Sequence, residues 1–206
     1  MREAAMSEAA MSEAQRVIET LRAGGIVLLP TDTVYGLAVH PVHGTDALAR
    51  LFAMKRRPLS RNLPIMVASP DQAEELGADV TGPARRLLAA FSPGPLTLAL
   101  GLDAARAPGW LDGRDEIAIR IPDDPLLLEV LRTVGPLLVT SANLHAQETP
   151  ESMRQVLDQL DGEPDLSLDG GVRATVPSTL VNCNLPAPAV ERVGAVPAEQ
   201  IAKVLA

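Results

Sequence analysis

Residues 25–40 read GIVLLPTDTVYGLAVH, which places two apolar runs of strand length on either side of a polar turn. The runs are Ile26 to Leu29 and Val34 to Val39, and each is predicted to form a strand. The turn between them holds Thr31, Asp32 and Thr33. Polar groups that follow a strand are well placed to line a cleft at the sheet edge.

Apolar runs alternate with helical patterns along the rest of the chain. Further strands are predicted at 65–68, 96–100, 117–121, 137–139, 179–181 and 190–193. Helices are predicted at 45–55, 70–77, 82–91, 124–134, 150–160 and 197–205. This alternation predicts an α/β fold: a single domain with a twisted mixed β-sheet, flanked by helices, that carries a ligand cleft.

The first helix of the domain is marked at both ends. Ser12 and Gln15 have the spacing of a capping box, and Gly24 with Gly25 is a typical helix stop. We therefore expect residues 12–206 to form the domain and residues 1–11 to be a flexible N-terminal extension.

Composition excludes several functional classes. The chain has 206 residues with a net charge of −8, one Trp, one Tyr and two Phe, so a broad basic surface with stacking aromatics is missing. We therefore expect weak or no direct nucleic-acid binding.

Cys183 is the lone cysteine, which rules out an internal disulfide and a thiolate zinc cluster and suits a reducing compartment. No apolar run approaches the roughly 20 residues that span a bilayer, so we expect a cytoplasmic protein without membrane association.

The stretch Lys55-Arg56-Arg57-Pro58 follows a helical pattern in an otherwise acidic chain. Adjacent cations repel one another, and an anion opposite them offsets that cost. The stretch therefore predicts a phosphate or carboxylate site, to which Arg61 adds a donor. A simpler explanation is a solvated basic helix end that complements the helix dipole. One cation would be enough to complement the helix dipole, whereas four cations occur here within seven residues.

Arg120 lies within the apolar strand 117–121 and has two possible orientations. It either points inward and is paired, or alternates outward and is a surface residue. The polar residues after other strands, such as Ser141, Asn143 and Ser178, either converge on one cleft or cap local turns. The three histidines have no ligand spacing, so no metal site is predicted.

Six ordered motifs resemble the YrdC-domain family of threonylcarbamoyl-AMP synthases over about residues 12 to 194. They are PTDTVYGL (30–37), KRRP (55–58), SPGPLT (92–97), IAIRIP (117–122), TSAN (140–143) and PSTLV (177–181). The family pairs its KxR motif with an SxN motif, and its fold is described as YrdC/RibB-like.

The resemblance implies a nucleotidyltransferase that uses ATP as a substrate. It would convert L-threonine, bicarbonate or CO2 and ATP into L-threonylcarbamoyl-AMP and pyrophosphate, the first step of threonylcarbamoyladenosine formation at position 37 of tRNA. Mg2+ carried with ATP and a downstream tRNA-modifying transferase complex are the implied partners.

The resemblance also implies roles for individual residues. The catalytic set is Lys55, Arg57, Ser141 and Asn143. The threonine side is Thr33, Tyr35, Arg120 and Ser178. The nucleotide side is Lys55, Arg57, Arg61, Ser141, Asn143 and Arg192.

Some features depart from the family pattern. Met66 stands where many relatives carry a histidine, and Glu116 would repel phosphate if it faced the cleft. The chain ends at Ala206 and so resembles the family's single-domain form.

Two other functions compete with this reading. One is a non-catalytic RNA-binding module for tRNA or ribosomal precursor RNA, which the net charge and scarcity of aromatics disfavour. The other is a longer carbamoyl-adenylating enzyme, whose zinc-finger-like segments a single cysteine excludes.

Overall fold

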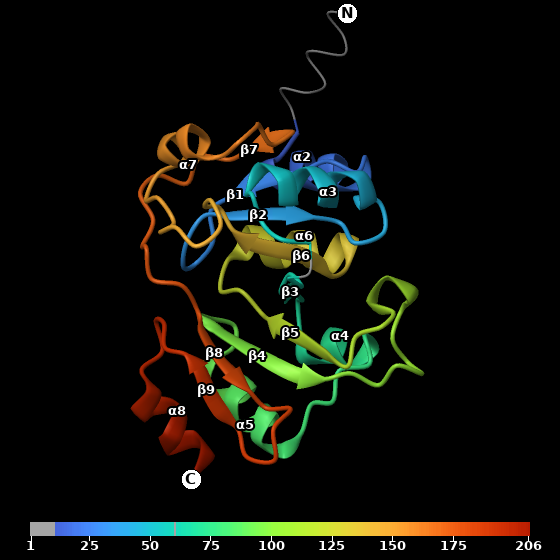
Figure 1. The fold of residues 1–206 in the computed structure, drawn as a ribbon, viewed down its shortest axis with the longest axis vertical. Helices are drawn as coiled ribbons and strands as arrows, with labels where there is room; N and C mark the ends of the chain where they lie inside the picture. The colour runs from blue at the N-terminus through green and yellow to red at the C-terminus, as the bar shows by residue number, and fades with distance from the viewer. Residues whose placement is uncertain (1–10, 60) are drawn as a thin grey trace, which may run out of the picture.

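In the computed structural model, which describes residues 11–59 and 61–206, nine strands form one mixed, twisted sheet (Figure 1). Their order across the sheet is β7 (Leu166–Ser167), β1 (Val27–Leu29), β2 (Gly36–Val39), β6 (Leu137–Ser141), β3 (Ile65–Met66), β5 (Glu116–Arg120), β4 (Leu96–Gly101), β8 (Thr179–Asn182) and β9 (Ala189–Arg192). The predicted α/β fold is confirmed. The short strand β7 was not predicted because its two half-buried residues form no apolar run.

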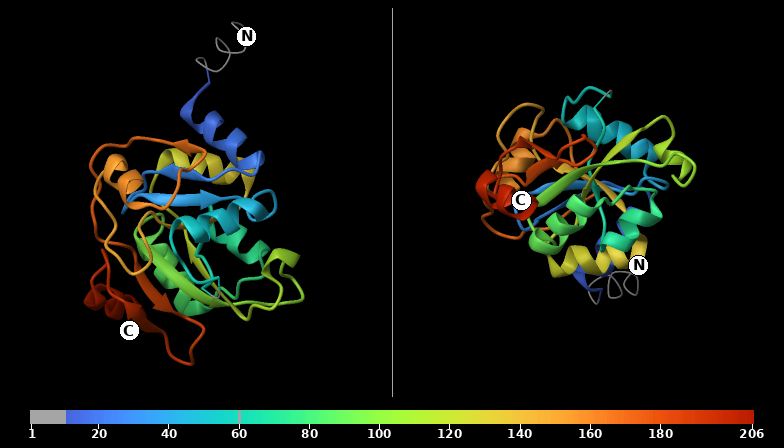
Figure 2. Two further views of the ribbon diagram at one scale, coloured as in Figure 1. Left: turned by 45° about the horizontal axis from the view of Figure 1, so that its top comes forward. Right: turned by 90° about the horizontal axis from the view of Figure 1, so that it is seen from below.

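The helices lie on both sides of the sheet (Figure 2). They are α2 (Glu13–Arg22), α3 (Thr45–Met54), α4 (Pro70–Glu75), α5 (Gly82–Phe91), α6 (Pro125–Val134), α7 (Met153–Gln159) and α8 (Ala198–Leu205), with a short 3-10 turn at Gly109–Leu111. None of the helices in the described part of the chain is long and apolar enough to cross a membrane.

The predicted start of the first helix is confirmed. Ser12 accepts the backbone N–H of Gln15, and the Gln15 side chain accepts the N–H of Ser12 in return. The expected extension at residues 1–11 lies, apart from Met11, outside the described residues.

The sheet separates two apolar cores because successive side chains of its strands point to opposite faces. Leu137 and Val139 of β6 pack with α2 and α6, whereas Leu138 between them packs into the larger core on the other face. Leu29 of β1, which lies in the first core, is fully buried. Burial on both faces explains why these strands read as continuous apolar runs.

Strand register brings distant motifs together at the cleft. Gly36 at the start of β2 pairs with Ser141 at the end of β6, and Leu96 of β4 pairs with Thr179 of β8. The predicted strand 34–39 begins only at Gly36, so Val34 and Tyr35 leave the ladder. They are thus available to line the cleft.

The turn after β2 is held by His40. Its Nδ1 accepts the backbone N–H groups of Val42 and His43 at 3.2 and 3.1 Å, which leaves Nε2–H to donate to the Val134 carbonyl at 3.2 Å. This pattern requires the neutral ring, because a proton on Nδ1 would oppose two N–H groups. Burial lowers the pKa of His40 below its usual value.

We therefore expect the free energy of unfolding to fall as the pH drops below about 6.5, the usual histidine pKa. The unfolded chain binds a proton there that the folded chain resists, so the loss is at most about 1.4 kcal/mol per pH unit. Chemical denaturation between pH 5 and 8 measures it. His40→Asn, whose side-chain oxygen can accept the same N–H groups, should flatten the profile. A profile equally steep in His40→Asn and in the control His145→Asn would contradict the assignment.

Candidate functional site

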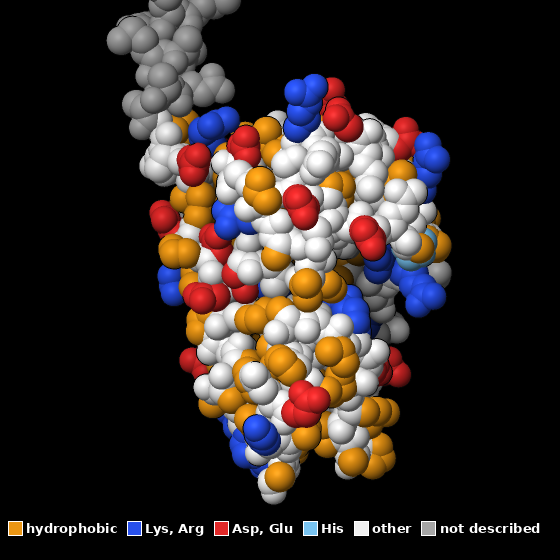
Figure 3. Space-filling view, turned by 90° about the vertical axis from the view of Figure 1, so that its left-hand side faces the viewer, with side chains coloured by type: hydrophobic (Ala, Val, Ile, Leu, Met, Phe, Trp, Pro, Cys, Tyr) orange, Lys and Arg blue, Asp and Glu red, His pale blue; other side chains and the backbone are white. Residues whose placement is uncertain are grey.

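A cavity of about 180 Å³ lies where strand ends from both parts of the sheet meet. The face seen in Figure 3 is hollowed at mid-height, with basic side chains in and beside the hollow. The predicted site residues that line the cavity are Thr33, Tyr35, Arg57, Arg120, Ser141, Ser178 and Arg192. These polar groups therefore converge on one cleft.

Lys55 lies behind the lining, at the end of α3, and is almost completely buried. Its ammonium donates to the Ser141 carbonyl at 2.5 Å and also to the Asn143 carbonyl. Burial and, to a smaller extent, the charge of Arg57 lower the pKa of Lys55 to about 7. The side chain thus links the KxR and SxN segments directly.

The turn that follows β6 is held by several further contacts. The Ser141 hydroxyl donates to Asn143 Oδ1 at 2.5 Å, and the Asn143 amide donates to the carbonyls of Leu144 and Gln147 at 2.7 and 2.6 Å. The Ala142 N–H donates to the Tyr35 carbonyl at 2.7 Å. The turn is therefore fixed before any ligand arrives.

The three adjacent cations do not form one cluster of charge, contrary to the expectation from their sequence. Arg56 adopts a left-handed conformation (φ 50°) and turns outward to pair with Asp161 at 3.0 Å. Arg57 lines the cleft, and its guanidinium donates to the Asn62 carbonyl at 3.0 Å. The divergence and the Arg56–Asp161 pair reduce the repulsion without a bound anion, so charge density alone does not demonstrate a ligand.

Arg61 lies beside the cleft and not in its lining. It lines a neighbouring hollow with Arg114, above apolar side chains that include Phe52 and Leu63. The charge of Arg61 contributes, after burial, to lowering the pKa of Arg57. The two arginines are thus near neighbours although they face different hollows.

Arg120 points inward, which settles the orientation that the sequence left open. Its guanidinium donates to Asp32 Oδ1 at 2.7 Å, Thr33 Oγ1 at 2.8 Å and the Gly94 carbonyl at 3.3 Å. Because the Thr31 hydroxyl donates to the Val34 carbonyl at 2.6 Å, Thr33 keeps its own proton for Thr31 or for a ligand.

Ser178 is held in a similar way from the other side of the cavity. Arg192 donates to the Ser178 carbonyl at 2.9 and 3.2 Å and to its hydroxyl oxygen at 3.3 Å. Thr97 shares a hydrogen bond of 2.8 Å with the same hydroxyl. Arg192 therefore uses donors to position Ser178, a contact that the sequence did not suggest.

Together these groups suit an anion. Guanidinium groups and hydroxyls with protons to donate line the cavity, and no carboxylate is among its described lining residues. A carboxylate or phosphate placed there gains charge-assisted hydrogen bonds in a partly desolvated setting.

Tyr35 contributes to the cavity wall, but its hydroxyl is used elsewhere. It accepts the Gly170 N–H at 2.9 Å and donates to the Gly171 carbonyl at 2.8 Å. Tyr35 thereby holds the segment that runs from β7 toward β8. This attachment joins residues far apart in the chain, and no sequence pattern indicated it.

Thr97 and Thr140 were not predicted for the site, although both line the cavity. Their place within the SPGPLT and TSAN motifs was the available signal. Met66, where the resemblance implies a histidine in many relatives, also lines the cavity. Glu116 is outside the lining and accepts from the amides of Asn182 and Asn184 at 3.2 Å, so it does not oppose an anion in the cleft.

Mg2+ is usually held by one or two carboxylates together with substrate phosphates. The cleft lining offers no carboxylate among the described residues, and no group of three or more metal-ligating side chains occurs within them. The residues present therefore do not form a Mg2+ site of their own.

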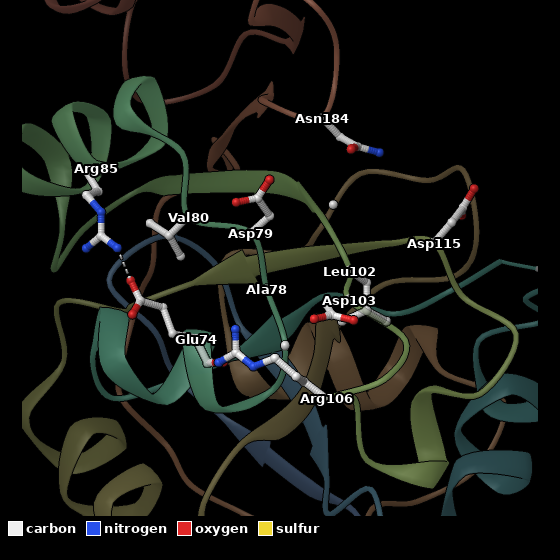
Figure 4. A pocket seen from close by; sticks show the side chains of 12 residues that line it. Glu74, Ala78, Asp79, Val80, Arg85, Leu102, Asp103, Arg106, Asp115 and Asn184 are labelled. Carbon is white, nitrogen blue, oxygen red and sulfur yellow. Dashed lines mark hydrogen bonds and ion pairs between the residues drawn. The ribbon is translucent and has the colours of Figure 1, made fainter.

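A larger hollow of about 500 Å³ lies elsewhere, near the ends of β4 and β5 (Figure 4). Its arginines are already engaged: Arg85 pairs with Glu74 at 2.5 Å, and Arg106 donates to the Glu74 carbonyl at 2.7 Å. Asp79, Asp103 and other acids complete its wall. None of the predicted site residues lines this hollow, which does not suit an anion.

Comparison with known proteins identifies the family. The sequence model of the Sua5/YciO/YrdC family, described as "Telomere recombination", matches residues 19–194. The chain belongs to the Sua5/YciO/YrdC family. It is 36% identical over 188 residues to a threonylcarbamoyl-AMP synthase of Bacillus subtilis, covering 90% of this chain and 54% of that protein. It is 33% identical over 189 residues to a putative threonylcarbamoyl-AMP synthase of Mycobacterium tuberculosis, covering 91% and 87%.

Solved structures of the Sua5/YciO/YrdC family agree. Sua5 of Pyrococcus abyssi complexed with L-threonine superposes with a TM-score of 0.83 at 32% identity, covering 93% of this chain and 57% of that one. Escherichia coli YciO superposes with a TM-score of 0.80 at 26% identity, covering 91% and 92%. The chain therefore spans about half the length of some curated relatives and nearly all of others.

We expect Lys55 to titrate near pH 7. Lys55 and Lys203 are the lysines of the chain, so NMR of protein with 13C-labelled lysine side chains gives one signal for each. Lys55→Met assigns the signals, and exposed Lys203 is the reference. Because the folded pKa lies below the ordinary lysine value of about 10.4, this group should also make stability rise with pH between about 7 and 10. A Lys55 chemical shift that still reports a protonated amine at pH 9 would contradict the expectation.

Proposed function

We propose that the protein is an L-threonylcarbamoyl-AMP synthase and thus a nucleotidyltransferase. The observation that carries the proposal is that Lys55 bonds directly to the Ser141–Asn143 turn, beside a cavity that holds Arg57 and Arg120. One cleft thus has cations and hydrogen-bond donors both near the Ser141–Asn143 turn and at Arg120. The match to the putative threonylcarbamoyl-AMP synthase of Mycobacterium tuberculosis covers 87% of that protein, and its name supports the reaction class.

We assign the amino-acid end of the cleft to Arg120, Thr33 and Ser178. The guanidinium of Arg120 provides donors for a carboxylate, and the two hydroxyls have protons to donate. The related Sua5 of Pyrococcus abyssi was crystallised in complex with L-threonine, which supports an amino-acid subsite. We therefore place the carboxylate of L-threonine here, with its amine directed toward Ser141.

We assign the nucleotide end to Ser141, Asn143 and Arg57, with Arg61 further out and Arg192 on the opposite side. A polyphosphate next to buried Lys55 would favour the ammonium over the neutral amine, because opposite charges attract strongly in a desolvated site. ATP binding should thus take up a proton at Lys55. Mg2+ would arrive bound to the phosphates, since the cleft supplies no carboxylate for it among its described lining residues.

The reaction that the family resemblance implies is compatible with this placement. The amine of L-threonine adds to CO2 and loses a proton, which gives a carbamate. A carbamate oxygen attacks the α-phosphorus of ATP, the bond to the β-phosphate breaks and pyrophosphate leaves. The protein contributes alignment and neutralisation of charge. The product is then available to a tRNA-modifying transferase complex.

Purified protein should form threonylcarbamoyl-AMP and pyrophosphate only when L-threonine, bicarbonate and ATP are all present. Lys55→Ala and Ser141→Ala should each lower kcat by about 100-fold, the scale expected when a group that stabilises transition-state charge is lost. Product chromatography and a pyrophosphate assay provide the measurements.

Arg56→Ala is the matched control because Arg56 is adjacent in sequence but points outward to Asp161. It should keep activity within about twofold, and near-ultraviolet circular dichroism checks that all three variants are folded. Equal loss in Arg56→Ala and Lys55→Ala, or full activity in Lys55→Ala, would refute the assignment. Absence of product from the wild-type protein would refute the proposed function itself.

A further inference from the structure

Asp32 forms a buried ion pair with Arg120 at the back of the cleft. The two side chains are 11% and 7% exposed, and Asp32 Oδ1 lies 2.7 Å from Arg120 Nη2. Asp32 itself is not in the cavity lining, whereas Thr31 and Thr33 on either side of it are. Its carboxylate therefore reaches the cleft through Arg120.

The second oxygen of the Asp32 carboxylate indicates that the ion pair contributes little to stability. Asp32 Oδ2 is buried and has no hydrogen-bond partner within the described part of the chain. Buried ion pairs lose hydration on folding, and well-packed apolar replacements are often as stable or more stable. A buried carboxylate with a hydrogen bond to only one of its oxygens adds little to the free energy of unfolding. The main effect of Asp32 is therefore to hold the Arg120 guanidinium.

Arg120 also needs a counter-charge because a second arginine shares the cavity. Arg120 and Arg192 line the same small cavity, so the two cations repel each other. The pKa of Arg192 is accordingly lowered, first by burial and then by the charge of Arg120. The other acceptors of Arg120 are neutral oxygens of Gly94 and Thr33. Asp32 thus allows two guanidinium groups to occupy one small cavity without moving apart.

We propose that Asp32 is a positioning residue for the amino-acid end of the cleft. It fixes the plane of the Arg120 guanidinium, and through Arg120 it keeps the Thr33 hydroxyl in place with its proton free to donate. The identity of the ligand, an amino-acid carboxylate, rests on the proposed function. The effect on Arg120 does not.

Calorimetric titration of L-threonine and, separately, of ATP into Asp32→Ala and Asp32→Asn tests the proposal. Asp32→Ala should weaken L-threonine binding by about tenfold or more, which corresponds to about 1.4 kcal/mol. Asp32→Asn keeps an acceptor for Arg120 and should weaken it by less. ATP affinity, to which Arg192 would contribute from the opposite side, should fall by less than L-threonine affinity in both variants. A merely structural role would lower the melting temperature and affect the two ligands alike.

Asp161→Asn is the matched control, because it removes the partner of Arg56 in an exposed ion pair away from the cleft. It should leave both affinities unchanged. L-threonine affinity within twofold of wild type in both Asp32 variants would overturn the proposal.

NMR of the arginine Nε–H groups gives a readout that does not depend on the reaction. The Arg120 Nε–H should exchange slowly in the wild type and in Asp161→Asn, and much faster in Asp32→Ala. Unchanged exchange in Asp32→Ala would overturn the proposal even if L-threonine binds. If the wild type binds no L-threonine, the proposed function fails, and the exchange rates alone decide the role of Asp32.

Discussion

The buried ammonium of Lys55 ties the end of helix α3 to the turn that follows strand β6. It donates to the carbonyls of both Ser141 and Asn143. The turn in turn places Ser141 in the cavity lining, whereas the Asn143 amide donates to carbonyls within the turn itself. Removal of one side chain therefore disturbs the charge, the backbone and the hydroxyl together.

The opposite wall of the cleft depends on balanced charge. Arg120 and Arg192 face the same cavity, and each is held by oxygen acceptors that the protein provides. The cavity is consequently prepared for an anion before one binds, so little reorganisation is needed on binding. Tyr35 joins the turn after β6 to the segment at Gly170, since its carbonyl accepts the Ala142 N–H and its hydroxyl accepts the Gly170 N–H.

Much of the fold could be predicted because it depends on local rules. The capping box at Ser12 and Gln15 and the apolar runs of the central strands are visible without tertiary information. Strand β7 could not be predicted, because its two residues become a strand only by pairing with β1. The function and most residue roles came from family resemblance and not from local pattern.

Side-chain direction was the main obstacle to predicting the site. Lys55, Arg56 and Arg57 look equivalent in sequence, and the left-handed turn at Arg56 sends them in three directions. Arg120 was ambiguous for a different reason. Ile119 and Arg120 at the end of β5 are both buried although they point to opposite faces, so alternation does not distinguish a core face from a solvent face there.

The sheet order has a consequence for synthesis on the ribosome. The cleft takes residues from Thr31 near the start of the chain and from Arg192 near its end, and β4 must wait for β8 to arrive before Thr97 meets Ser178. A nascent chain therefore cannot complete the cleft around Arg120 before β8 and Arg192 have been synthesised. Ligand binding during synthesis would report completion of the whole sheet and not of any early part.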